Sequence, residues 1–163
     1  MFRKTILPLV FSLFFIQTIQ AEEKYDVSNI YFHMGVIGAF AEMVNLDVKK
    51  IGLSEMFSAS DATKYEPIIK QITQRNGVLY YREDNFLVTD LYPAMKTQGL
   101  SLFLIYKDDS LDQYLALKEK KKNLIAENKY DKIARYEIAF QFGKLLSYPD
   151  KNIKILLNKN EKP

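Results

Sequence analysis

Apolar residues recur at helical spacing in the first part of the chain, and short apolar runs between the helical stretches suit strands. Between Ser28 and Asn45 the apolar positions stand three or four apart, which predicts a helix with Ser28 as its N-cap. Residues 51–53 predict a short strand. Isoleucines after residue 65 predict a second helix, which ends at residues 76–77 because Asn-Gly suits a C-terminal cap.

Three further apolar runs predict the remaining strands. Residues 78–81 form the first, and the polar turn 82–85 indicates that residues 86–89 return as its hairpin partner. The run Leu-Phe-Leu-Ile-Tyr at 102–106 is the clearest strand of the chain. Together with residues 51–53, these runs predict a sheet of three or four strands.

Helices dominate the last third. Ser110 stands three residues before Gln113, as in a capping box, and opens a long helix through YLALKEKKKNLIAE. A further helix is expected over residues 132–146, and Tyr-Pro at residues 148–149 opens a short last one. We interpret the lysine-rich run 118–122 as a solvated helical face, with a binding patch as the alternative.

The order of these elements predicts the fold class. A strand, a helix and a strand across residues 51–81 imply a parallel pair joined by a right-handed crossover. We therefore expect an α/β or α+β fold. It would be one small domain over residues 22–163, with a three- to four-stranded mixed sheet, a βαβ unit, flanking helices and a helical C-terminal third.

The first 21 residues have the layout of a secretory signal peptide. Arg3 and Lys4 give a basic start, a mostly apolar run covers residues 5–16, and a polar tail ends at the small residue Ala21. The alternative is an uncleaved anchor, but this run is shorter than the roughly 17–25 residues that span hydrocarbon. We therefore expect cleavage after Ala21, no membrane span in the mature chain, and a periplasmic or secreted protein.

Charge and composition exclude several kinds of chemistry. Loss of Arg3 and Lys4 lowers the formal net charge from +3 to about +1, so the sequence indicates no nucleic-acid partner. The chain has no cysteine, which excludes disulfides, thiolate catalysis and cysteine-ligated zinc. It has no Asn-x-Ser/Thr sequon either, and both absences favour a bacterial source. The carboxylates lack metal-binding spacing and the glycines lack a phosphate-binding motif, so we expect no metal and no cofactor.

Polar residues that follow the strands form the candidate site. In open α/β sheets ligands bind beside the carboxyl ends of the strands, and the single histidine, His33, begins a helix expected at that edge. Two helix starts add amides that favour anions, and Arg82 can grip a carboxylate or phosphate with two hydrogen bonds. The stretch 107–110 is expected at the same edge. The candidate ligand-binding residues are His33, Ser54, Glu55, Ser58, Ser60, Asp61, Arg82 and Asp84.

Each of these features also has a structural interpretation. The serines and aspartates suit helix caps and turns, and Arg82 can simply pair with Glu83 or Asp84. Gly35 and Gly38 fall on one helical face, where they favour the close approach of a neighbouring element over a ligand groove.

The sequence leaves three functions open. The leading interpretation is an exported, non-catalytic binding or accessory protein that takes a small anionic ligand or a protein partner at this edge. The second is a small exported hydrolase that acts at the same edge through His33, and the third is a secreted interaction protein with a tyrosine-rich surface. The third rests on the 11 tyrosines and 11 phenylalanines of the chain, among them Tyr80, Tyr81, Tyr92, Tyr106 and Tyr136.

Overall fold

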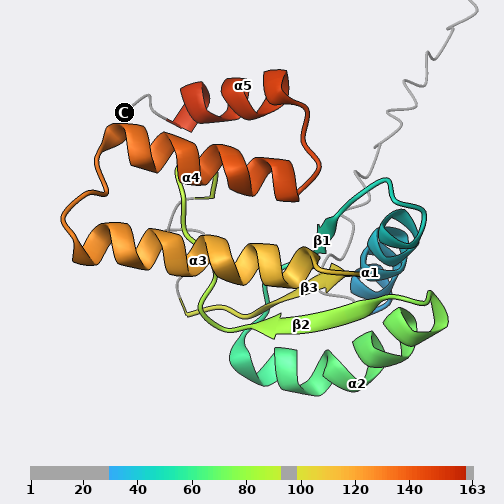
Figure 1. Cartoon of the computed structure of the whole chain (residues 1–163). Helices are drawn as coiled ribbons and strands as arrows, with labels where there is room; N and C mark the ends of the chain where they lie inside the picture. Colours follow the sequence, from blue (N-terminus) through green and yellow to red (C-terminus); the bar gives the residue numbers. More distant parts are fainter. Residues whose placement is uncertain (1–29, 93–98, 161–163) are drawn as a thin grey trace, which may run out of the picture.

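A three-stranded sheet separates two layers of helices in the computed structural model, which describes residues 30–92 and 99–160 (Figure 1). The strands are β1 (Ile51–Leu53), β2 (Leu79–Glu83) and β3 (Leu102–Tyr106). One face carries α1 (Ile30–Asn45) and α2 (Ala59–Arg75). The C-terminal part on the other face consists of α3 (Ser110–Ala126), α4 (Lys132–Leu145) and α5 (Asp150–Asn160).

These elements confirm the mixed α/β class, the number of strands and the helical C-terminal part of the chain. The predicted signal peptide, its cleavage site after Ala21 and the predicted N-cap Ser28 lie outside the described residues. Export therefore stays a prediction.

The most apolar strand takes the centre of the sheet. β3 pairs antiparallel with β1 on one side and with β2 on the other, so the strand order is β1-β3-β2. The predicted mixed sheet with a directly paired βαβ unit is wrong. β1 and β2 point the same way, but β3 lies between them, and the unit is a split βαβ. Because four of the five β3 residues are buried, the position covered on both faces suits this strand best.

The predicted hairpin between residues 78–81 and 86–89 is also wrong, because β2 takes β3 as its partner. Residues 86–89 instead cross to α3. The Leu87 N–H donates to the Tyr114 hydroxyl at 3.1 Å, and Thr89 and Tyr92 exchange two backbone hydrogen bonds of 3.0 Å. The side chains of Phe86 and Leu87 are buried there, so an apolar run that resembles a strand serves as a core segment without sheet pairing.

The helix boundaries follow from their caps. α2 begins at Ala59, earlier than predicted, because the Ser58 hydroxyl accepts a hydrogen bond from the Asp61 N–H as an N-cap. It ends as predicted, at the cap Asn76, followed by Gly77 with a φ of +68°. α3 begins as predicted at Ser110, but its N-cap is Asp109.

The sheet divides the core in two, because alternate side chains of β3 point to opposite faces. Phe103 and Ile105 join α1 and α2. Leu102 and Leu104 join the C-terminal helices, where Tyr114 and Phe142 are among the largest fully buried side chains. The sheet end at which β1 and β2 finish is thereby held between two packed layers.

Gly52 of β1 and Gly143 of α4 are the described glycines at which a neighbouring helix approaches most closely. A Cβ added at Gly52 would lie 2.8 Å from Phe40 Cβ of α1. No described atom lies within 4 Å of a Cβ added at Gly35 or Gly38, so the predicted close approach at these two glycines is wrong. The close contact between α1 and β1 therefore requires a glycine at position 52 of the strand.

We expect Gly52→Ala to lower the free energy of unfolding by about 1–3 kcal/mol, because the new methyl group overpacks against Phe40. Gly38→Ala is the matched control, and alanine should stabilise α1 there by about 0.5–1 kcal/mol. Urea denaturation measures both variants. Equal stabilities of Gly52→Ala and the parent chain would contradict the close approach of α1.

Candidate functional site

The structure brings most of the predicted site residues to one end of the sheet. β1 and β2 run in the same direction, so Ser54 and Glu55 leave β1 at the end where Arg82 and Asp84 close β2. Residues 107–110 lie at the opposite end, because β3 runs antiparallel to both strands, and their predicted place at this edge is wrong.

His33 reaches this edge as predicted and contacts the first residues after β1. Its Nδ1 is hydrogen-bonded to Glu55 Oε2, and its ring packs edge-on against Phe57 with centroids 5.1 Å apart. The side chain is only 13% exposed. A histidine oriented by a carboxylate is the arrangement of a general base, although none of its described contacts is with a serine hydroxyl.

Ser54 continues the hydrogen bonding between β1 and β3 beyond the last residue of β1. Its N–H donates to Phe103 O at 2.9 Å, and its buried hydroxyl accepts from the Phe103 N–H at 2.9 Å. The same hydroxyl donates to Glu55 O at 2.7 Å. Ser54 therefore satisfies backbone groups and is not presented to a ligand.

Ser58, Ser60 and Asp61 form the start of α2. The Ser58 hydroxyl donates to Asp61 Oδ2 at 2.7 Å, and the two serine hydroxyls lie 2.9 Å apart. This geometry is that of an N-terminal helix cap, the structural alternative that the sequence suggested for these residues.

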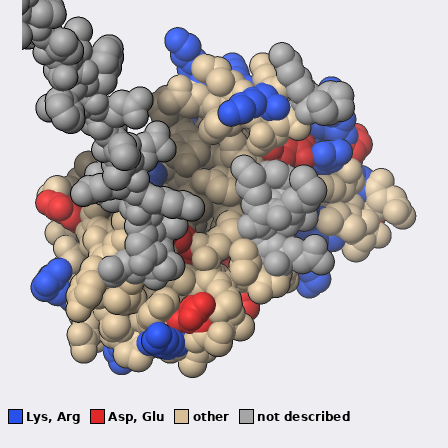
Figure 2. Space-filling model, turned by 180° about the vertical axis from the view of Figure 1, so that it is seen from behind, with Lys and Arg blue, Asp and Glu red and all other residues tan. Residues whose placement is uncertain are grey.

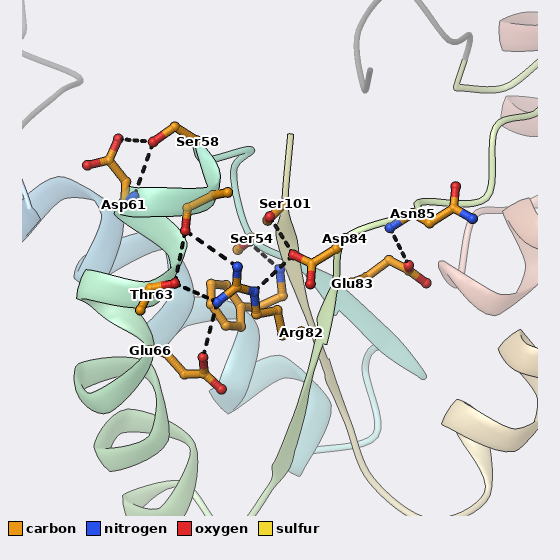
Figure 3. Close-up of polar contacts among 12 residues, drawn as sticks. Ser54, Ser58, Asp61, Thr63, Glu66, Arg82, Glu83, Asp84, Asn85 and Ser101 are labelled. Carbon is orange, nitrogen blue, oxygen red and sulfur yellow. Dashed lines mark hydrogen bonds and ion pairs between the residues drawn. The ribbon is translucent and has the colours of Figure 1, made fainter. Parts of the chain in front are cut away.

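Arg82 joins β2 to α2 (Figure 3). Its Nε donates to Asp84 Oδ1 at 2.9 Å, one terminal nitrogen donates to Thr63 Oγ1 at 2.9 Å, and the other reaches Ala59 O at 3.4 Å. Glu66 adds an ion pair at 3.5 Å. An anion would have to displace acceptors of this protein from the guanidinium.

Asp84 is also held by Ser101, the residue before β3, which donates to the same oxygen as Arg82. The Ser101 hydroxyl donates to Asp84 Oδ1 at 2.5 Å. This hydrogen bond, together with the one from Arg82, lowers the pKa of Asp84 below its ordinary value. The cluster thus ties α2, β2 and the start of β3 together.

We expect Arg82→Gln to lower the free energy of unfolding by about 1 kcal/mol, because the partners are partly exposed and solvent screens the ion pairs. If Arg82 also grips an anion, phosphate or succinate should raise the melting temperature of the parent chain but not that of the variant. Thermal unfolding with each anion checks both expectations. An unchanged melting temperature without anions would contradict the stabilising role.

A buried carboxylate that the sequence did not predict lies beside this edge. Glu83 is 2% exposed, and its carboxylate accepts hydrogen bonds from the Tyr114 hydroxyl at 2.9 Å and from Lys118 Nζ at 2.7 Å. The Asn85 N–H donates to the other oxygen at 2.8 Å. Burial, reinforced by the nearby Glu83, raises the pKa of Tyr114, so its phenol remains a donor.

The lysine-rich run 118–122 is divided between two roles. Lys118 and Lys121 donate to backbone carbonyls of the segment after β2, Asn85 O and Val88 O, each at 2.6 Å. Lys122 lies exposed and pairs with Glu119 at 3.2 Å. The predicted solvated face is therefore wrong for Lys118 and Lys121. A cavity of about 370 Å³ lies along this contact, but these lysines already have protein acceptors.

The tyrosines do not gather on one patch. Tyr80 and Tyr81 point to opposite faces of β2 and join different cores. Tyr92 is partly buried, and its hydroxyl lies 3.3 Å from that of Tyr148. Tyr136 is exposed on α4 and stacks on Phe140.

A second candidate site, which the sequence did not predict, lies beside the edge of β1 that pairs with no described strand. We call this cavity of about 310 Å³ the edge groove. From behind, the surface is hollowed between the C-terminal helices and the lower part of the molecule (Figure 2). The groove is lined by Phe40, Lys49, Ile51, Leu53, Ser54, Met56, Tyr92, Leu102, Leu146 and Tyr148.

Lys49 is the charged side chain of the edge groove. Its ammonium donates to Leu146 O at 2.7 Å and lies 5.8 Å from the Phe40 ring centroid and 5.2 Å from that of Tyr148. Burial lowers its pKa below the ordinary value. No ion pair joins Lys49 to an aspartate or glutamate of the described residues. The groove thus offers a partly desolvated cation within mostly apolar walls.

Comparisons of the chain with protein-family models, with curated proteins and with solved structures found no match. Within residues 30–92 and 99–160, no group of three or more histidine, aspartate or glutamate side chains is arranged to hold a metal ion. No helix in those two ranges is long and apolar enough to cross a bilayer. Function must therefore be argued from the sites themselves.

Proposed function

We propose that the protein is an exported, non-catalytic binding protein whose ligand carries a carboxylate and occupies the edge groove. The observation that carries this proposal is the Lys49 ammonium, which is partly desolvated and has no carboxylate partner among the described residues. At the predicted edge, by contrast, Arg82 already has Asp84 and Glu66 as partners. A carboxylate would supply the opposite charge that Lys49 lacks.

The size and lining of the edge groove support the same proposal. A volume of about 310 Å³ is at the lower end of ligand pockets, and a few polar groups in a mostly apolar lining are typical of them. The further polar side-chain groups there are the hydroxyls of Tyr92, Tyr148 and Ser54, and that of Ser54 is bonded to the backbone. The ligand class supported is therefore a small carboxylate with an apolar body.

The test is a screen of alkyl carboxylates on the mature chain, followed by NMR chemical-shift changes. Hexanoate should perturb Leu53, Met56 and Tyr148, with a Kd in about the millimolar range. Hexan-1-ol should bind more weakly because it lacks the charge. Lys49→Met should remove this difference, whereas Lys50→Met, the exposed neighbour, should preserve it. If no carboxylate perturbs the groove, the proposed site is wrong.

Export is part of the proposal and rests on the layout of residues 1–21. Expressed in a bacterium with a periplasm, the chain should be recovered outside the cytoplasm with Glu22 as its first residue. Intact mass and N-terminal sequencing of that fraction test this. A retained Met1 in the membrane fraction would contradict it.

A small hydrolase is the second candidate, and the pairing of His33 with Glu55 favours it. Such an enzyme should hydrolyse at least one member of a panel of chromogenic esters and amides. His33→Ala and Glu55→Gln should then abolish turnover, whereas Glu42→Ala, an exposed position of the same helix, should leave it unchanged. Absence of turnover by the parent chain would remove this candidate.

A further inference from the structure

Among residues 30–92 and 99–160, the backbone of β1 pairs with a strand on one side only. The Ser54 N–H donates to Phe103 O, so alternation along the strand turns the backbone groups of Gly52 and Ser54 toward β3. The N–H and C=O of Ile51 and Leu53 therefore point away from β3. Because β1 is at the end of the strand order, no strand of the described sheet receives them.

The edge groove borders β1 and is lined by side chains of both layers. Its walls come from both layers: Phe40 belongs to the helical layer on one face, whereas Tyr92 and Leu146 belong to the core on the other. Because the groove touches β1 and side chains of both layers, it has room for a chain that lies beside β1. Ile51 is buried, and Leu53 is the β1 residue that is partly exposed toward this space.

The position of Lys49 determines how a bound chain would be oriented in the edge groove. It stands two residues before Ile51, at the amino end of β1. An ammonium has three donors, and the described contacts of Lys49 use one of them, on Leu146 O. A terminal carboxylate bound there would end a chain that runs antiparallel to β1, since its last residue would lie beside the first residues of the strand.

We propose that the ligand of the edge groove is an extended peptide segment with a free C-terminal carboxylate. The segment adds antiparallel to β1, pairs its backbone with Leu53, and places its carboxylate on Lys49. The sheet then has the order peptide-β1-β3-β2. This inference rests on the proposed function, of which it names the ligand class.

The hydrogen-bonding groups of the β1 backbone favour a peptide over other apolar carboxylates. A fatty acid satisfies Lys49 and the apolar walls but offers nothing to the N–H of Leu53. An extended peptide supplies one C=O and one N–H opposite Leu53, and it directs alternate side chains toward Met56 and toward Phe40. The matched ligand is therefore a peptide whose last residues are apolar or β-branched.

The experiment uses the mature chain and a library of acetylated pentapeptides that have valine, leucine, isoleucine or phenylalanine at alternate positions and a free carboxylate. Calorimetry should find members that bind at least about tenfold more tightly than hexanoate. The C-terminal amide of the best member, and its analogue N-methylated at the residue opposite Leu53, should each bind about tenfold more weakly, because each loses a hydrogen-bonding or charged partner.

Variants of the protein provide the second arm. Lys49→Met should weaken the acid about tenfold and leave the amide unchanged, whereas Lys50→Met should change neither by more than about twofold. Circular dichroism establishes that each variant is folded, and the amide and N-methyl peptides test the proposal on the parent chain whatever the variants do. If hexanoate binds and the peptides bind no more tightly, the proposal of a peptide ligand is wrong, but the carboxylate-binding function stands. The same conclusion follows if N-methylation of the peptide has no effect on its affinity.

Discussion

Glu83→Ala is expected to lower the free energy of unfolding by about 3–5 kcal/mol, because it removes one partner of a buried, hydrogen-bonded charge pair. The change leaves Lys118 Nζ and the buried Tyr114 hydroxyl without their common acceptor. It also frees the Asn85 N–H and loosens the segment that this lysine holds. Urea denaturation with circular dichroism measures the loss.

The controls separate the buried pair from surface charge. Glu119→Ala on the same helix as Lys118 removes an exposed ion pair with Lys122 and should change stability by no more than about 0.5 kcal/mol. The double variant Glu83→Met with Lys118→Met should recover much of the loss, since an apolar pair has no charge to desolvate. A loss below about 1 kcal/mol in Glu83→Ala would show that the pair contributes little.

Phe103→Ala should cost about 3–5 kcal/mol, because it empties the centre of the core between the sheet and the two N-terminal helices. Phe103 is fully buried on the central strand, and its ring packs against those of Phe57 and Tyr80 with centroids about 6 Å apart. Thermal and urea unfolding check the loss. Ile133→Ala, at an α4 side chain that is 71% exposed, is the control and should stay within about 0.5 kcal/mol.

The local pattern of apolar residues, caps and turns predicts the bounds of several helices and strands. It does not predict which strands pair with each other. The strand at residues 102–106 has the predicted bounds, and α2 ends at Asn76 with Gly77, because both depend on neighbouring residues. The partner of β2 depends on competition between residues 86–89 and β3. The Leu87 N–H donates to the Tyr114 hydroxyl across the fold, and no spacing in the sequence reports this contact.

Glu83 could have been identified from the sequence by extending one strand. The predicted strand ends at residue 81 and leaves Glu83 in a turn, but β2 continues to Glu83. Side chains alternate along a strand, so Glu83 lies on the face of Tyr81, which packs against the core of the C-terminal helices. A charged residue two positions after a core residue was the available signal.

The edge groove could not be derived from the sequence, because its two sides meet across the chain. Lys49 contacts Leu146, and the Lys50 N–H donates to the Ser147 hydroxyl at 2.8 Å, in each case across 97 residues. The junction of α4 and α5 creates the groove by docking beside β1. The predicted edge residues other than His33 were found because they stand at or soon after the end of β1 or β2, and the structure gives most of them capping and bridging contacts.

The central position of β3 governs the order in which the sheet forms during synthesis. β1 and β2 have no partner in each other, so a nascent chain that ends before residue 102 contains two strands and no pair. Both ladders of the sheet include β3, so neither can form before β3 is synthesised. Forming each ladder also closes a loop of the chain between its two strands. The sheet therefore forms late in synthesis, after α1 and α2 are complete.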